Sequence, residues 1–156
     1  MIAHGGVFLR PAERSDVPLF VAWMNDWTMS RTIGLVAPMS EAMEDQWFER
    51  VVANQGKDGY HFTICLLADD RPIGTIGLFE LNLRNGDAGL GISIGTAEDR
   101  GKGHGSDALR ALLWFGFGQM QSRAVRAAMP ALQAAIRAAI AGADRPVPSG
   151  RASLPA

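Results

Sequence analysis

The sequence predicts an α+β domain (an α/β sandwich), with a mostly antiparallel sheet flanked by helices, and three observations support this fold class. A short apolar strand is followed by two amphipathic helical segments. Three segments rich in β-branched and aromatic residues then follow one another, separated by tight turns. Finally, a glycine-rich turn precedes another amphipathic helix. Because strands joined by short turns pair antiparallel, these elements predict a meander with helices on its faces.

The first part of the chain predicts one strand and two helices. Residues 7–9 are a short apolar strand. A helix begins near Asp16, where a capping residue precedes a helical spacing of apolar side chains, and it ends near Asn25. Residues 29–38 are expected to form a loop. A second amphipathic helix is expected over about residues 41–54.

The middle of the chain predicts the sheet. Residues 60–68 and 73–83 have the composition of strands and are separated by the turn sequence DDRP. A second turn at 84–87 leads to a third strand at 88–94. Residues 100–106 then form a glycine-rich turn into a helix whose buried stripe reaches about residue 117.

That glycine-rich turn, RGKGHGS, is the segment that suggests chemistry. Its three glycines let backbone N–H groups approach an anion, and the following helix places its positive dipole end at the same point. Arg100, Lys102 and His104 add positive charge, so the turn predicts a diphosphate-binding site; the alternative is a plain connection between a strand and a helix. The turn lacks the GKS or GKT ending of Walker A, and Ser106 stands where the dinucleotide fingerprint needs glycine.

Composition excludes several classes of protein. The chain has 156 residues, enough for one domain, and Cys65 is its only cysteine, so an intrachain disulfide is impossible. Three scattered histidines offer no zinc-ligand spacing. We expect no bound metal, no membrane-spanning segment and a cytoplasmic protein. A net charge of -1 argues against nucleic-acid binding, and the acidity of residues 1–120 favours a cationic substrate.

The composition changes near residue 120. The last 36 residues contain no aromatic residue but twelve alanines, five arginines and four prolines. We therefore expect an incomplete domain over 1–120 and a helical, then disordered, tail over 121–156, as in a chain truncated or frame-shifted after about residue 120. The alternative is that an apolar stripe from Val125 to Ile140 forms a genuine helical cap.

The order of these elements, together with Arg100-x-x-Gly103-x-Gly105 at a helix start, resembles the GNAT superfamily of N-acetyltransferases. The segments LRPAERSD, GTIGLFEL and AEDRGKGHGSDAL resemble the branch that acetylates ribosomal-protein N-termini, polyamines and other small amines. The resemblance covers residues 7 to about 118. The later strands of the family are not recognisable after that point, so we expect C-terminal strands to be missing.

The resemblance implies an acetyltransferase that uses acetyl-CoA and acts on a primary amine: a protein N-terminus, a polyamine or another small amine. The coenzyme diphosphate would bind the amides of the glycine turn, the pantetheine arm would lie beside the third meander strand, and the Ile94 N–H would meet the acetyl oxygen. The implied coenzyme-binding residues are Ile92, Ser93, Ile94, Arg100, Gly101, Lys102, Gly103, His104, Gly105 and Ser106.

Glu80 is the candidate catalytic residue, either as the base or as the group that binds a cationic amine, because it interrupts an apolar strand. Its alternative role is that of a solvent-facing strand residue. Tyr60 is the only tyrosine, so the later tyrosine that often protonates the leaving thiolate in this family has no counterpart. The alternative function is a non-catalytic coenzyme-binding or interaction domain, in which an open sheet edge pairs with a second copy or another protein.

Overall fold

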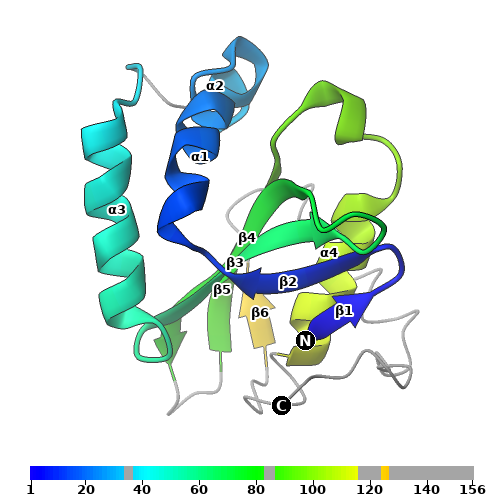
Figure 1. Ribbon diagram of the computed structural model, residues 1–156. Helices are drawn as coiled ribbons and strands as arrows, with labels where there is room; N and C mark the ends of the chain where they lie inside the picture. Colours follow the sequence, from blue (N-terminus) through cyan, green and yellow to red (C-terminus); the bar gives the residue numbers. More distant parts are fainter. Residues whose placement is uncertain (34–36, 83–86, 116–123, 127–156) are drawn as a thin grey trace.

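The computed structural model describes residues 1–33, 37–82, 87–115 and 124–126 (Figure 1). Within this part of the chain, six strands form one sheet in the order β1-β2-β3-β4-β5-β6. The helices and strands are β1 (Ile2–His4), β2 (Val7–Pro11), η1 (Arg14–Asp16), α1 (Val17–Met24), α2 (Trp27–Ile33), α3 (Glu41–Asn54), β3 (Gly59–Leu66), β4 (Pro72–Asn82), β5 (Asp87–Ile94), η2 (Ala97–Asp99), α4 (His104–Trp114) and β6 (Ala124–Arg126). The α+β fold class is confirmed.

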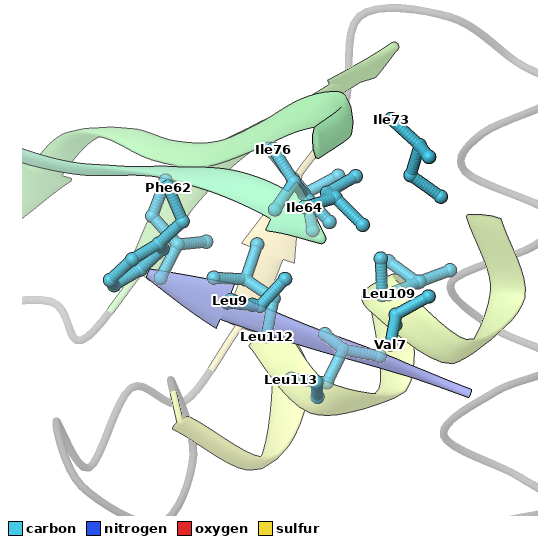
Figure 2. Packing of buried hydrophobic residues seen from close by; sticks show 13 residues of the cluster. Val7, Leu9, Phe62, Ile64, Ile73, Ile76, Leu109, Leu112 and Leu113 are labelled. Carbon is cyan, nitrogen blue, oxygen red and sulfur yellow. The ribbon is translucent and has the colours of Figure 1, made fainter. Parts of the chain in front are cut away.

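Helices cover both faces of the sheet. α1 and α3 lie on one face and α4 lies on the other (Figure 1). The main core forms between α4 and the strands, as Figure 2 shows. Its buried side chains are Val7, Leu9, Phe62, Ile64, Ile73, Ile76, Leu78, Leu90, Ala108, Leu109, Ala111, Leu112 and Leu113. Because successive strand residues point to opposite faces, strand residues that alternate with the core positions of β2, β3 and β5 face α1 and α3.

The predicted meander is present. β3, β4 and β5 pair antiparallel, with Ile76 of β4 opposite both Phe62 of β3 and Ile92 of β5. The first strand of the sequence prediction is β2, and the helix predicted over 41–54 is α3. Residues 83–86, in the second predicted turn, lie outside the described part of the chain.

The helix α2 corrects the loop expected over 29–38. The Asp26 carboxylate accepts hydrogen bonds from the N–H groups of Thr28 (3.1 Å) and Met29 (3.2 Å), so it caps the first turn. Met29 is buried. Packing of that side chain gives the short helix a stability that the local sequence pattern did not reveal.

Two further strands were not expected. β1 pairs with β2 across a turn at Gly5, whose φ of +58° suits glycine. β6 pairs parallel with the first residues of β5, from Asp87 to Gly89, which corrects the expectation that no strand follows residue 120. The outer edge of β5 carries backbone groups that can pair with any extended segment, whatever side chains it has. The amino-acid composition of residues 121–156 therefore could not predict this strand. The rest of the predicted tail, 127–156, lies outside the described residues.

A buried carboxylate joins β2, α1 and β3. Asp16 accepts two hydrogen bonds from the Arg10 guanidinium (2.8 and 2.9 Å), one from the Glu13 N–H (2.8 Å) and one from the Thr63 hydroxyl (3.3 Å). Burial raises the pKa of Asp16, but these hydrogen bonds outweigh burial and leave the pKa below its ordinary value. The network therefore stabilises the start of α1 against the sheet.

Replacing Asp16 with asparagine should lower the free energy of unfolding by about 3 kcal/mol, because it leaves the half-buried Arg10 without its charged partner. Denaturant unfolding at pH 7 measures the change. The matched control is Asp45→Asn, which removes an exposed partner of Arg14 and should cost less than about 1 kcal/mol. Equal losses in the two variants would contradict the assigned role of Asp16.

Candidate functional site

The predicted glycine turn lies between β5 and α4. Gly101 and Gly103 have φ values of +75° and +86°, in the left-handed region that favours glycine. A Cβ added at either residue would meet nothing within 4 Å. The two positions therefore require glycine for its backbone conformation and not for lack of space.

The start of α4 presents unpaired backbone donors. Asp107 donates its N–H to the Gly103 carbonyl (3.0 Å), while the N–H groups of His104, Gly105 and Ser106 precede the first position that can bond within the helix. These donors and the helix dipole make the turn suitable for an anion. The Asp107 carboxylate is held by the Gly6 N–H of the β1–β2 turn (3.1 Å).

Arg100 has a different position from the one expected for a phosphate ligand. Its guanidinium donates to the carbonyl oxygens of Ile94 (3.1 Å) and Gly95 (3.3 Å), and its own N–H donates to the Ala97 carbonyl (3.2 Å). Arg100 thus joins the turn to the end of β5. The side chain of Lys102, in contrast, is exposed.

An ion pair between a buried carboxylate and an exposed guanidinium fixes the segment that precedes the turn. Asp99 accepts hydrogen bonds from both terminal nitrogens of Arg71 (3.0 and 2.9 Å) and from the Thr96 hydroxyl (2.6 Å). The hydrogen bonds from Arg71 are the main reason why the pKa of Asp99 is lowered to about 2. Because Arg71 lies in the β3–β4 turn, the pair attaches the coenzyme-binding candidate segment to the sheet. Sequence analysis did not identify this pair, since its members are 28 residues apart.

The residues Ile92, Ser93 and Ile94 lie on β5 next to this turn, as predicted. The Gly95 N–H donates across the sheet to the Ile73 carbonyl (2.7 Å), so by antiparallel alternation the backbone groups of Ile94 face the outer edge of β5. The hydrogen bond from Arg100 to the Ile94 carbonyl agrees with that direction. Among the described residues, β6 pairs with β5 only from Asp87 to Gly89, and the edge beside Ile94 remains open.

The two faces of β5 differ in bulk. Ile92 and Ile94 pack against the core below α4. The other face carries Gly89, Gly91, Ser93 and Gly95, and a Cβ at Gly89 or Gly95 would overlap an aromatic ring, that of Phe79 or of Trp23 respectively. Between the two rings, the hydroxyls of Ser93 and Thr75 lie 3.2 Å apart. The α1 and α3 face of β5 therefore carries a polar pair flanked by two rings.

A cavity of about 510 Å³ lies between α3 and the β3–β4 hairpin, beside the start of β3 and the end of β4. Glu80 lines it and is exposed. The backbone of Glu80 has a φ of +51°, at an irregularity in the β4–β5 pairing between Phe79 and Asn82. The residues that line the cavity are Trp47, Arg50, Val51, Asn54, Gln55, Asp58, Gly59, Tyr60, His61, Gly77, Leu78, Phe79 and Glu80.

His61 is a cavity residue to which the sequence assigned no role. Gln55 fixes its backbone by accepting from the His61 N–H (2.9 Å) and donating to its carbonyl (3.2 Å). The Trp47 ring lies edge-on to the imidazole, with centroids 4.6 Å apart. Burial lowers the pKa of His61 to about 4, so the imidazole is neutral at pH 7. The Nε2 atom is buried and has no hydrogen-bond partner among the described residues.

The strand register separates Glu80 from Ile94. Phe79 pairs with Gly89, and Gly74 pairs with Ile94. Five residues of extended chain span about 17 Å, so the Glu80 carboxylate is too far away to take a proton from an amine at Ile94. Of the two roles predicted for Glu80, the spacing argues against that of a base in direct contact with the amine, and the binding of a cationic amine stays a prediction.

Two searches of the described residues bear on the class of site. No group of three or more histidine, cysteine, aspartate or glutamate side chains there is arranged to hold a metal ion. No helix among them has the length and apolar character needed to cross a membrane.

Comparisons with known proteins agree with the geometry. The family described as acetyltransferase (GNAT) domain matches residues 7–142, which extends past the end near residue 118 that the sequence suggested. A proposed ribosomal-protein-serine acetyltransferase from Vibrio cholerae superposes with a TM-score of 0.70 at 20% identity, covering 88% of this chain and 79% of that one.

Two other solved structures are similar. A ribosomal alpha-N-protein acetyltransferase in complex with coenzyme A gives a TM-score of 0.70 at 16% identity, covering 88% of this chain and 81% of that one. Spermidine N-acetyltransferase from Vibrio cholerae, in complex with CoA and spermine, gives a TM-score of 0.63 at 21% identity, covering 75% of this chain and 67% of that one. At these identities the likeness concerns the fold. A search of curated proteins gives no match.

Replacing Asp99 with asparagine should lower the free energy of unfolding by about 2 kcal/mol at pH 7. The Asp99 pKa is lower in the folded chain, so its contribution is present above the unfolded pKa near 4 and is lost as pH falls toward 2. Denaturant titrations along that range should show the difference between wild type and variant shrinking. Glu98→Gln, on the exposed neighbour, is the control, and an equal loss there would contradict the assignment.

His61 should make the protein less stable in mild acid. Its pKa is lowered in the folded chain, so the unfolded chain binds a proton first and stability falls as pH drops from about 6.5 to about 4. His61→Asn should remove up to about 1.4 kcal/mol per pH unit of that slope, measured by denaturant unfolding. Identical slopes would show that the imidazole is not desolvated.

Proposed function

Because this chain belongs to the acetyltransferase (GNAT) family, we propose that it transfers the acetyl group of acetyl-CoA to a primary amine. Members of this family are acyltransferases with acetyl-CoA as co-substrate. The observation that carries the proposal is the turn between β5 and α4, which places N–H groups without a partner in the helix beside a strand edge that no described strand covers at Ile94. A diphosphate and an extended pantetheine arm need those two features next to each other.

We assign the coenzyme diphosphate to the N–H groups of the turn and of the first residues of α4. The exposed ammonium of Lys102 supplies positive charge there, and the two left-handed glycines let the backbone curve around the phosphates. Arg100 acts as a positioning residue, because its hydrogen bonds hold the turn against β5. The pantetheine arm lies along the open edge of β5 at Ile92, Ser93 and Ile94.

The Ile94 N–H is the proposed donor to the acetyl oxygen, on which negative charge develops. The transfer joins the amine nitrogen to the acetyl carbon, releases the coenzyme thiol and removes one proton from the amine. We propose that the amine reaches Ile94 from the α1 and α3 face, where the hydroxyls of Ser93 and Thr75 can orient it. Glu80 binds a remote part of the acceptor.

Coenzyme binding without turnover is the second candidate function. Tyr60 stacks on Phe62 and packs edge-on to Phe115, away from the open edge of β5, so it cannot replace the proton-donating tyrosine of the family. In that case the open edge serves to pair with a second copy or another protein. An assay of thiol release with a panel of amines separates the two functions, since turnover supports transfer and binding alone supports this alternative.

Substituting Gly103 by alanine should weaken acetyl-CoA binding about tenfold, because it disfavours the left-handed backbone that directs the amides toward the phosphates. Isothermal titration calorimetry measures the affinity. Gly105→Ala is the matched control: its Cβ would meet Ile92 and Ile94 side-chain atoms at the ordinary distances of 3.9 and 4.0 Å. Unchanged affinity in Gly103→Ala would contradict the proposed diphosphate site.

A further inference from the structure

Asp99 places a negative charge directly before the turn that we assign to the coenzyme diphosphate. It is the last residue of η2, and Arg100 follows it. Its side chain has an exposed fraction of only 3%, so water screens the charge poorly. An unpaired carboxylate in this place would repel a diphosphate in the turn. The proposed anion site therefore needs a group that cancels the charge of Asp99.

Arg71 is that group, and it comes from a part of the chain outside the turn. Its two terminal nitrogens donate to the two carboxylate oxygens of Asp99, at 3.0 and 2.9 Å. Such a bidentate contact orients the carboxylate as well as neutralising it. The Thr96 hydroxyl donates to one of the same oxygens (2.6 Å), so Asp99 is held from two sides.

The β3–β4 turn fixes the backbone of Arg71. The Arg71 N–H donates to the Asp69 carboxylate (3.1 Å), and the Arg71 carbonyl accepts from the Leu66 N–H (3.0 Å). Asp70, between them, has a φ of +62°, in the left-handed region that few residues other than glycine, asparagine and aspartate adopt. The guanidinium therefore projects from a tightly bonded turn, which limits the places where Asp99 can lie.

Lys102 connects this ion pair with the proposed ligand. The hydrogen bonds from Arg71 lower the pKa of Asp99 most, and the nearby charge of Lys102 lowers it further. The Lys102 ammonium therefore interacts with the carboxylate and also lies in the turn proposed for the diphosphate. Without Arg71, Asp99 would attract this ammonium away from the phosphates. The pairing with Arg71 keeps Lys102 available for them.

We propose that Arg71 is a positioning residue for coenzyme binding, which acts by neutralising and orienting Asp99 and not by contact with the coenzyme. The inference rests on the proposed function, because it takes the turn between β5 and α4 as the diphosphate site. The affinity for acetyl-CoA then depends on a residue of the β3–β4 turn, 28 residues away from Asp99 in the sequence. Coupling of this kind between two parts of a chain changes affinity by about fivefold or more.

The test is calorimetric titration of the full chain with acetyl-CoA in the absence of an amine. Arg71→Gln leaves an unpaired carboxylate beside the turn and should weaken binding about tenfold. The double variant with Arg71→Gln and Asp99→Asn should recover an affinity within about threefold of wild type, because no unpaired carboxylate remains. A double variant as weak as Arg71→Gln would show that Arg71 does not act through Asp99, and it would overturn the proposal.

Two further variants serve as controls. Arg14→Gln removes the same charge from an exposed arginine that pairs with Asp45 and Glu49, away from the turn, and it should leave the affinity unchanged. Arg71→Lys keeps the charge but not the bidentate contact, so it should bind acetyl-CoA more tightly than Arg71→Gln does. An equal loss in Arg14→Gln and Arg71→Gln would overturn the proposal, since net charge alone would then explain both.

A second ligand separates positioning from a general disturbance of the fold. S-acetylpantetheine carries the thioester and the pantetheine arm but no diphosphate. Its affinity should be the same in wild type and in Arg71→Gln, because Asp99 acts on the diphosphate. Far-UV circular dichroism verifies that the variants are folded. An equal fold-loss for acetyl-CoA and S-acetylpantetheine would overturn the proposal.

Failure of this inference can be told apart from failure of the proposed function. Acetyl-CoA binding that depends on Arg71, with no acetylation of any amine, supports the inference and refutes acetyl transfer. Acetylation of amines by an Arg71→Gln variant with unchanged acetyl-CoA affinity supports acetyl transfer and refutes the inference. A wild-type chain that does not bind acetyl-CoA refutes both.

Discussion

The backbone between β5 and α4 has to reverse its direction while leaving the first N–H groups of α4 without a partner inside the helix, and the candidate site depends on how that segment is held. Unpaired amides do not stabilise their own conformation. Side chains do so instead: Asp99 binds Arg71 of the β3–β4 turn, and Arg100 binds the carbonyls at the end of β5. Asp107 adds a contact to the β1–β2 turn. Three separate parts of the sheet therefore fix the start of α4, where the proposed anion site lies.

The sheet provides the second half of the site because its two faces are built differently. Branched aliphatic residues on one face pack against α4 and close it. Glycines on the opposite face of β5 let Phe79 and Trp23 lie directly on the backbone, and the hydroxyls of Ser93 and Thr75 lie between those rings. The edge of β5 that we propose for the coenzyme and the face that we propose for the acceptor thus belong to a single strand. That arrangement leaves room for an acceptor without opening the core.

Charge follows the same division. The coenzyme side offers backbone donors and Lys102, whereas the cavity below α3 offers Asp58 and Glu80. A neutral, desolvated His61 lies among the acidic and aromatic residues of that cavity, with its backbone fixed by Gln55. The backbone donors and Lys102 therefore lie at one end of the sheet, and the acidic side chains of the cavity lie near the other.

The sequence alone determined the meander, the helix α3 and the glycine turn, because alternation, helical spacing and left-handed glycines are local properties of the chain. It also predicted that the stretch from Ile92 to Ser106 forms one site, since the strand and the turn are adjacent in sequence. Only the tertiary structure showed that Arg100 binds the strand, that Arg71 holds Asp99, and that His61 lines a cavity with Glu80. Those facts depend on which residues distant in sequence become neighbours. The strand β6 and the helix α2 could not be predicted from the sequence either. The free energy that forms them comes from pairing and packing with other elements and not from local propensity.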